Sequence, residues 1–261
     1  MLQQIASQLP PLAATVAPLA GEVLEALSAI SQMGYRAVQL SATQVGTRPR
    51  DLDTSGRKDL LVQLRKFGLS CAGLDLWIPS SHFTDPAFVD RAVNAASQTV
   101  RLAAALGRCS VSLALNEQDD HNASALVDIR AALAELALHE GVRIADHGLD
   151  AATGKWSAES SSFLGVGIDP AMLIAAGHDV CAAVSRCGSS LFCARYVDLL
   201  RSGMRGPPNE PRESRLDFEA YALALASTPL TTSPIADARQ WTEPHTGLRL
   251  TLERWTGVAA R

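Results

Sequence analysis

A repeated order of amphipathic helix, glycine and short apolar strand is the feature that most limits the folds open to this chain. Residues 21–33 place Leu27 and Ile30 on one helix face, Gly34 follows, and residues 37–41 form an apolar strand. Strands that alternate with helices pair in parallel through right-handed crossovers. The repeat therefore predicts an α/β protein built on a parallel sheet.

The full pattern yields a set of expected elements. Strands are expected at residues 12–16, 37–41, 71–77, 109–115, 142–146, 165–169, 191–199 and 233–238. Helices are expected at residues 21–33, 58–67, 86–107, 124–139, 170–176, 217–227 and 247–255, with long loops at 149–163 and 201–216. Eight such units close a (β/α)8 TIM barrel, which we expect as one domain over residues 1–261. The alternative is an open doubly wound sheet, but no GxGxxG or Walker sequence follows the first strand.

Composition excludes several classes of protein. The 261 residues are 47 % hydrophobic and 19 % charged, with a formal net charge of −4, so a large core is expected and a nucleic-acid partner is not. No apolar run of about 20 residues predicts a membrane span. The first 23 residues lack a basic region, so no signal peptide is expected. Five cysteines without a CxxC pair favour a reduced, cytoplasmic compartment.

The barrel prediction locates the candidate site, because catalytic groups of such barrels lie at the C-terminal ends of the strands. Asp146 and His147 end the fifth strand, Asp169 ends the sixth and Asp237 ends the eighth. Closing the barrel would bring these side chains together. Carboxylate and imidazole groups converging in a pocket suit Mn²⁺, Mg²⁺ or Zn²⁺.

Each of these residues also has a purely structural interpretation. Asp169 precedes a proline and a helix, so it is a candidate N-cap. Asp146 and His147 are followed by a glycine and could form only a turn. Asp237 and Arg239 could form an ion pair at the barrel rim.

Other side chains at the same strand ends are candidates for contact with a substrate. Trp77 and His82 follow the third strand, with packing and loop roles as their alternatives. Arginine side chains are suited to anionic groups such as carboxylates and phosphates. The candidate substrate-binding residues are Trp77, His82, Arg195, Asp198 and Arg239.

Five segments make the chain resemble a known family. They are LSAISQMGYRAVQL (27–40), LDLWIP (74–79), GVRIADH (141–147), GVGIDP (165–170) and ARYVD (194–198). In this order and spacing, over residues 24–238, they resemble the xylose isomerase-like TIM barrels, the sugar phosphate isomerase and epimerase group related to the apurinic endonucleases. The resemblance implies a sugar isomerase or epimerase with one divalent metal ion.

The family's metal ligands are a Glu after strand 5, an Asp after strand 6, a His on strand 7 and a Glu on strand 8. Asp169 matches the strand-6 ligand, and Asp237 lies near the strand-8 position. His147, or Asp146 with a slip of one residue, falls at the strand-5 position. The resemblance thus assigns metal binding to His147, Asp169 and Asp237.

The strand-7 motif of the family is His-x-x-Asp, and here it reads Arg195-Tyr-Val-Asp198. Arginine has no lone pair for a metal and adds positive charge where the ion would bind. A cation about 5 Å away would be repelled by roughly 3 kcal/mol at an effective dielectric of 20. The family metal site is therefore expected to be degraded.

Two functional hypotheses follow. In the first, a divergent sugar or sugar-phosphate isomerase or epimerase uses Asp146 or Asp237 as its base, and Arg195 binds an anionic group of the substrate. In the second, the barrel has lost the chemistry and binds a ligand or a protein, and Arg195 pairs with Asp169 or Asp146. A DNA-repair activity is disfavoured because the chain has only six histidines, most of them away from strand ends. A homodimer is also expected, since barrels of this size often pair.

Overall fold

Eight parallel strands close into a barrel. The computed structural model describes residues 10–19, 21–116, 123–154, 156, 161–208 and 212–259. The strands follow the order β1-β2-β3-β4-β5-β6-β7-β10 around the ring, and β10 pairs with β1 to close it. Their bounds are β1 (Ala13–Thr15), β2 (Ala37–Ser41), β3 (Ser70–Asp75), β4 (Ser110–Leu113), β5 (Ile144–Asp146), β6 (Leu164–Ile168), β7 (Leu191–Tyr196) and β10 (Ile235–Ala236). The predicted (β/α)8 fold class is confirmed.

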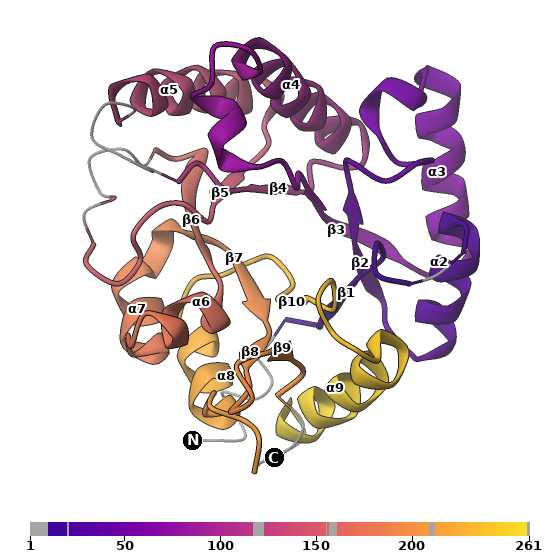
Figure 1. Cartoon of the computed structure of the whole chain (residues 1–261). Helices are drawn as coiled ribbons and strands as arrows, with labels where there is room; N and C mark the ends of the chain where they lie inside the picture. The colour runs from indigo at the N-terminus through magenta and orange to yellow at the C-terminus, as the bar shows by residue number, and fades with distance from the viewer. Residues whose placement is uncertain are drawn as a thin grey trace.

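The helices form an outer ring around the strands, as Figure 1 shows in a view along the barrel axis. They are α2 (Val23–Gln32), α3 (Thr54–Lys66), α4 (Val89–Ala105), α5 (Ala123–Glu140), α6 (Pro170–Ala175), α7 (Val180–Cys187), α8 (Phe218–Ala226) and α9 (Pro244–Ala259). Short 3₁₀ turns are η1 (Pro49–Asp51), η2 (Ser80–Phe83) and η4 (Gly188–Ser190). Among the described residues, none of the helices has the length and apolarity that a membrane crossing requires.

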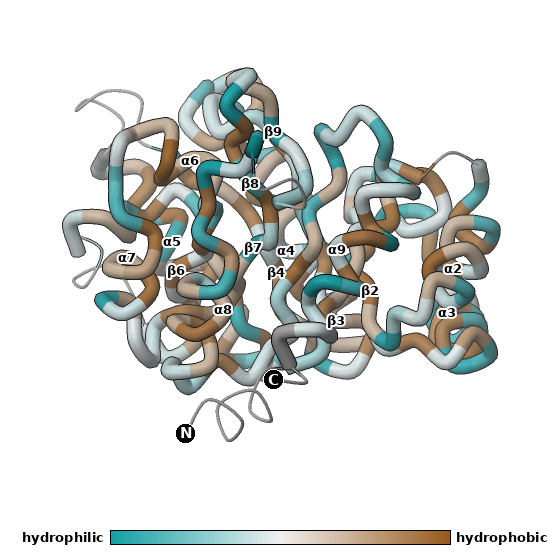
Figure 2. Tube along the Cα trace, turned by 90° about the horizontal axis from the view of Figure 1, so that it is seen from below, coloured by the Kyte–Doolittle hydropathy of each residue, from teal (hydrophilic) through white to brown (hydrophobic). Residues whose placement is uncertain are grey.

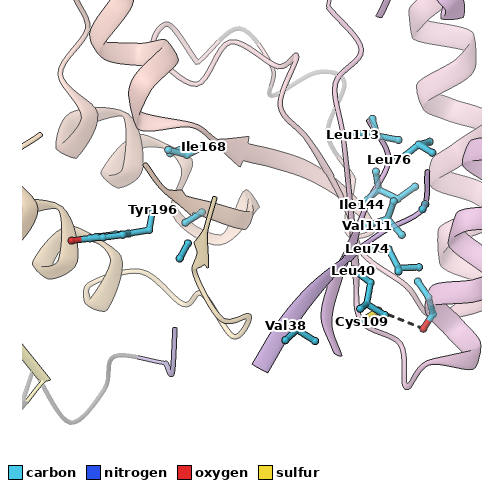
Figure 3. Close-up of a cluster of buried hydrophobic side chains, with 14 of the residues drawn as sticks. Val38, Leu40, Leu74, Leu76, Cys109, Val111, Leu113, Ile144, Ile168 and Tyr196 are labelled. Atoms are coloured by element: carbon cyan, nitrogen blue, oxygen red, sulfur yellow. Dashed lines mark hydrogen bonds between the residues drawn. The ribbon is translucent and has the colours of Figure 1, made fainter. Parts of the chain in front are cut away.

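Most of the core lies between the strands and the helices. Successive residues of a strand face opposite sides of the sheet, so alternate side chains point outward. Figure 3 shows Leu74, Val111 and Ile144, from three neighbouring strands, gathered on one such surface. All three are fully buried. This layer fixes the strands and therefore the direction in which their inward-facing residues point.

Inward-facing apolar residues fill the barrel interior in a second, smaller cluster. Its buried members are Ala13, Ala37, Ala145, Phe192, Cys193 and Ile235. Small side chains predominate because the space inside an eight-stranded barrel is narrow. We call this set the interior cluster.

Side-chain caps explain where several helices begin. Asp53 accepts a hydrogen bond from Gly56 N at 2.7 Å, so α3 begins earlier than the predicted residue 58. The helix predicted from residue 86 begins only at Val89. Asp85 instead accepts a hydrogen bond from Ala87 N at 2.8 Å, which forms a turn before the helix.

Two further features differ from the sequence-based expectation. The short helix α7 was not predicted, although Asp179 caps it through Ala182 N at 2.9 Å. The strand expected to reach residue 199 ends at residue 196. Beyond it, β8 (Asp198–Leu199) pairs antiparallel with β9 (Arg205–Gly206), inside the predicted loop 201–216. Figure 2 shows β8 and β9 together at one rim of the barrel.

The predicted loop 149–163 contains no helix of more than one turn in its described residues, and residues 155 and 157–160 lie outside them. The extent of the domain, residues 1–261, stays a prediction.

Candidate functional site at the barrel mouth

Five buried polar residues lie where strands of the barrel end. Each is at most 8 % exposed, and they come from five different strands. They are Asp75 on β3, His147 after β5, Asp169 after β6, Arg195 on β7 and Asp237 after β10. As predicted, one end of the barrel brings together His147, Asp169, Arg195 and Asp237. Asp75 lies at the same end.

Arg195 is the centre of an ion-pair network. Its Nη1 donates to Asp169 Oδ2 at 3.2 Å, and its Nη2 donates to Asp75 Oδ1 at 3.2 Å. Asp237 Oδ2 lies 3.6 Å from Nη1. One guanidinium group therefore holds three carboxylates, from β3, β6 and β10, around the barrel axis.

A second arginine reaches the network from the hairpin over the rim. Arg205, on β9, donates through Nη1 and Nη2 to the two oxygens of Asp169 at 3.2 and 2.7 Å. Its Nη2 also lies 3.6 Å from Asp237 Oδ2. Because β9 is anchored in this way, the hairpin is tied to the mouth of the barrel.

Arg239 completes the network from the other side. It donates to both carboxylate oxygens of Asp237, at 2.6 and 2.5 Å, and to Asp75 Oδ2 at 2.5 Å. Its guanidinium carbon also lies 4.3 Å from the ring centroid of Trp77, a cation–π arrangement. The predicted Asp237–Arg239 pair is therefore present, and it extends to Asp75 and Trp77.

Burial and the arginines act in opposite directions on the titration of the carboxylates. Burial would raise the pKa of Asp237, but the hydrogen bonds from Arg239 and the charge of Arg195 hold it well below its ordinary value. At Asp75, burial outweighs Arg239 and Arg195, and the pKa is raised. Burial would lower the pKa of Arg195, but Asp237, Asp75 and Asp169 raise it further above its ordinary value.

His147 is buried beside this network without a hydrogen-bond partner for either ring nitrogen. Burial, followed by the charges of Arg195 and Arg239, places its pKa well below the ordinary value. The ring packs directly over Gly167, where a Cβ would lie 2.5 Å from the ring atoms. The imidazole is therefore neutral at physiological pH and fixed in place.

A cavity of about 280 Å³ opens at this end of the barrel. Its polar lining includes Asp75, His147, Asp169, Arg195 and Arg205, together with Ser80, Asn116 and Gln240. The apolar lining includes Trp77, Ile78, Pro79 and Met172. Trp77 is 56 % exposed, with the Arg239 guanidinium lying over its ring. The cavity combines an apolar wall with a dense polar floor.

Three predicted site residues lie elsewhere. Asp146 faces outward from the barrel, where it pairs with Arg130 of α5 at 2.9 Å and accepts hydrogen bonds from Leu115 N and Gly148 N. Alternation along β5 explains this, because neighbouring residues of a strand face opposite sides and His147 takes the inward direction. The predicted place of Asp146 in the cavity is therefore wrong.

Asp198 and His82 also make their contacts outside the cavity. Asp198 is fully buried and accepts hydrogen bonds from Ser214 Oγ, Arg215 N and Leu216 N at 2.6 to 3.0 Å. It anchors the chain that follows the hairpin. His82 stacks on Phe88, with ring centroids 4.5 Å apart, and does not line the cavity.

In the described residues, the acidic side chains of the mouth differ from an open divalent-metal site in two respects. No cluster of three or more His, Cys, Asp or Glu side chains with the geometry to hold a metal occurs in the described part of the chain. Asp75, Asp169 and Asp237 each already accept hydrogen bonds from arginine. A divalent cation placed among them would meet positive charge and carboxylates that are already occupied. His147, Asp169 and Asp237 remain a predicted ligand set that this geometry does not support.

Asp75 and Arg205 are the functional candidates that sequence reasoning left out of the site. Asp75 is the last residue of β3, so the sequence indicates only that it lies at the rim of the barrel. Its partner Arg195 is 120 residues away, and no local pattern reveals that pair. Arg205 belongs to a run of arginines in a segment that reads as a solvated loop, and only the hairpin directs it to Asp169.

Comparison with known proteins identifies the fold. No protein-family model matches the chain, and no curated protein matches it by sequence. A xylose isomerase domain protein from Planctomyces limnophilus superimposes with a TM-score of 0.73 at 17 % identity, covering 95 % of this chain and 98 % of that one. D-Psicose 3-epimerase from Clostridium cellulolyticum H10, solved with D-tagatose, gives a TM-score of 0.76 at 11 % identity, with coverage of 97 % and 100 %.

A xylose isomerase-like TIM barrel protein from Mycobacterium smegmatis, solved in complex with magnesium, gives a TM-score of 0.75 at 12 % identity, with coverage of 97 % and 98 %. These neighbours match over nearly their whole length, so the shared fold covers the complete barrel. The chain has the fold of the xylose isomerase-like TIM barrels and sugar epimerases, at 11 to 17 % sequence identity to the three compared.

Proposed function

We propose that this chain is a sugar isomerase- or epimerase-like protein that binds a small hydroxylated carbonyl compound at the barrel mouth, with Arg195 in place of a divalent ion. The observation that carries the proposal is the position of Arg195. Its guanidinium bonds to Asp169 and Asp75 and lies 3.6 Å from Asp237, so one fixed cation stands among three carboxylates.

A guanidinium group can take over one task of a metal ion, the stabilisation of negative charge that develops on a substrate oxygen. It stays charged at every ordinary pH and presents its N–H donors in a rigid plane. The surrounding carboxylates hold this plane in place before any ligand arrives. Preorganised charge of this kind is effective because nothing needs to reorient during the reaction.

The walls of the cavity support a small polyhydroxylated ligand. A volume of about 280 Å³ is just below the usual range of about 300–1,000 Å³ for small-molecule sites, which suits a ligand as small as a single sugar. Trp77 and Met172 offer apolar surface to the C–H face of a sugar ring. Asn116 and Gln240 offer amide groups to its hydroxyls.

The structural neighbours supply further support from analogy. Neighbours whose names state an activity include D-psicose 3-epimerase and L-ribulose 3-epimerase. Shared fold does not by itself transfer an activity, and the cavity of this chain is what favours a sugar ligand.

Ligand binding tests the proposal. Saturation-transfer NMR with a panel of aldoses and ketoses of five and six carbons is expected to reveal binding to the wild-type protein. Ala114→Leu narrows the cavity and should abolish the signal, since Ala114 lines it. Ala131→Leu is the matched control. Ala131 is exposed on α5 and does not line the cavity.

Binding that survives in Ala114→Leu as in Ala131→Leu would move the ligand site away from the barrel mouth. An absence of binding across the whole panel would contradict the proposed ligand class.

A further inference from the structure

Two cysteine side chains meet at the end of the barrel that lies away from the mouth. Cys71 is the second residue of β3, and Cys109 is the residue before β4. Their Sγ atoms lie 3.5 Å apart, and both thiols are free. The sulfur atoms of a disulfide lie about 2.05 Å apart. A short movement of the two side chains would therefore bring them to bonding distance.

A β-bulge in β3 explains why Cys71 faces its partner. The pairing of β3 with β2 passes over Ala72, which is therefore an extra residue in the strand. Ala72 packs against the interior cluster, and a Cβ on Gly73 would lie 3.7 Å from Nε2 of Gln39, so both residues face into the barrel. Without the extra residue, alternation from Leu74 would turn Cys71 inward as well. The bulge instead places Cys71 on the outer side of the strand.

Cys109 lies on the same outer side of the neighbouring strand. It belongs to the main core between the strands and the helices, and Cys71 packs against that core. Figure 3 shows Cys109 in the same layer as Leu40 and Leu74. Neighbouring strands lie about 4.8 Å apart, and the Cα atoms of disulfides are about 4.4–6.8 Å apart. The backbone therefore already has the spacing of a disulfide, and only the side chains need to turn.

The two thiols differ in their access to solvent and in their acidity. Cys71 is partly exposed, whereas Cys109 is 8 % exposed. The hydrogen bond with Cys71, and after it burial, raise the pKa of Cys109 well above its ordinary value. Cys71 is therefore the thiol that a dissolved oxidant meets first, and Cys109 is the protonated thiol beside it.

From this geometry we propose that Cys71 and Cys109 close to a reversible disulfide within the folded barrel, by exchange with a small-molecule disulfide. The bond joins β3 to β4 at the start of both strands. The far ends of the same strands carry Asp75 and Leu113, which line the cavity. Because the cysteines lie at the opposite end from the cavity, this modification site does not depend on the proposed sugar ligand.

Two exchange steps form the bond, and they conserve every atom and electron. The Cys71 thiolate attacks one sulfur of the small disulfide, whose S–S bond breaks, and the other half leaves as a thiolate that takes up the proton lost by Cys71. Sγ of Cys109 then attacks Sγ of Cys71, the mixed S–S bond breaks, and the second half leaves with the proton of Cys109. The protein loses two electrons and two protons, and the small disulfide is reduced to two thiols.

Incubation of the native protein with glutathione disulfide tests the proposal. Remaining thiols are blocked with iodoacetamide, and tryptic peptides are analysed by mass spectrometry without reduction. Cleavage after lysine and arginine gives peptides 67–91 and 109–130, which hold Cys71 and Cys109 as their only cysteines. The expected product is these two peptides joined by a bond that dithiothreitol releases. A mixed disulfide of Cys71 with glutathione should not accumulate, because the second thiol is held beside it.

Single substitutions separate the two steps. Cys109→Ala removes the second thiol and should leave Cys71 as a stable mixed disulfide with glutathione. Cys71→Ser, at the more exposed position, should prevent both the link and any modification of Cys109. Cys181→Ala is the matched control, because Cys181 is also partly exposed but lies on α7, and it should form the link at the wild-type rate. Circular dichroism checks that each variant is folded.

Urea unfolding tests whether the bond fits the native barrel. The link restricts the unfolded chain over residues 72–108, so the oxidised wild-type protein should unfold at a higher urea concentration than the reduced protein. The same treatment of Cys71→Ser should leave the urea midpoint unchanged.

Four outcomes would overturn the proposal. They are a Cys71 thiol that does not react, a mixed disulfide that persists on Cys71 in the wild type, a link that forms only in urea, and a lower urea midpoint for the oxidised protein than for the reduced protein. Each would show that the folded barrel does not let the two sulfur atoms reach bonding distance.

Discussion

The two ends of the barrel interior stand on the same strands but have opposite chemistry. At one level, Ala145, Cys193 and Ile235 are packed in the apolar interior cluster. Two residues further along the same strands, the inward positions hold His147, Arg195 and Asp237. The strand therefore sets the direction of each side chain, while the residue type differs from one layer to the next.

The two layers also differ in how their members depend on one another. In the interior cluster each side chain contributes through packing, and truncating one leaves no charge unpaired. In the mouth, three arginines and three aspartates compensate one another's charge, so removing one leaves others buried and unpaired.

The largest effect is expected from Arg195→Met, which keeps the volume and removes the central charge. Three carboxylates would then share two guanidinium groups, and loss of one partner from a buried pair costs about 3–5 kcal/mol. Urea unfolding at pH 7 measures the change. A decrease in the free energy of unfolding of less than about 1 kcal/mol would show that the arginines and aspartates of the network depend little on one another.

A smaller effect, and one that depends on pH, is expected from Asp237→Asn. The depressed pKa of Asp237 means that its ionised form stabilises the fold above the unfolded pKa of about 4, and that this contribution is lost as pH falls through the folded value. At pH 7 the variant should be less stable by about 1.5–3 kcal/mol, the usual range for a charged hydrogen bond.

The difference between wild type and Asp237→Asn should shrink as the pH is lowered from 5 towards 2. Unfolding curves recorded across this range provide the measurement. A constant difference at every pH would contradict the depressed pKa.

The interior cluster is expected to respond more weakly to a conservative change. Ile235→Val removes one buried methylene and should cost about 0.5–1.5 kcal/mol, independent of pH and salt. Thermal and urea unfolding at two salt concentrations measure it. A salt-dependent loss would mean that the two layers are coupled more closely than their chemistry indicates.

The smallest effect is expected from an exposed arginine–carboxylate pair. Arg249 and Glu253 on α9 lie 2.8 Å apart, with side chains 54 % and 60 % exposed. Arg249→Gln should change the free energy of unfolding by less than about 0.5 kcal/mol, because solvent and salt screen the pair. A larger change would weaken the contrast between buried and exposed pairs.

Much of this molecule could be predicted from its sequence because the barrel repeats one local pattern. The strands and most helices follow from apolar periodicity and glycine stops, and the mouth follows from the rule for strand ends. The inward direction of His147 could also have been predicted. Ile144 and Asp146 are two residues apart on β5 and share one face, so the side chain of the next residue, His147, points to the other face. Asp146 was misplaced because that alternation was not applied.

What could not be predicted depends on contacts between distant parts of the chain. The pairs Arg195–Asp75 and Arg239–Asp75 span 120 and 164 residues. The hairpin that brings Arg205 to Asp169 has two residues in each strand, too few to produce a periodic pattern. The helix α7 was missed because its eight residues follow closely after the Gly177 break.

Calorimetric titration with Mn²⁺ tests the central claim, that a guanidinium group holds the place of a divalent ion, most directly. The account predicts no stoichiometric binding to the wild-type protein, because Arg195, Arg205 and Arg239 already neutralise the carboxylates. Arg195→His, which exchanges the central cation for a neutral donor, is expected to bind the ion where the wild type does not. One equivalent of Mn²⁺ bound by the wild type and lost in Asp169→Asn would contradict the account.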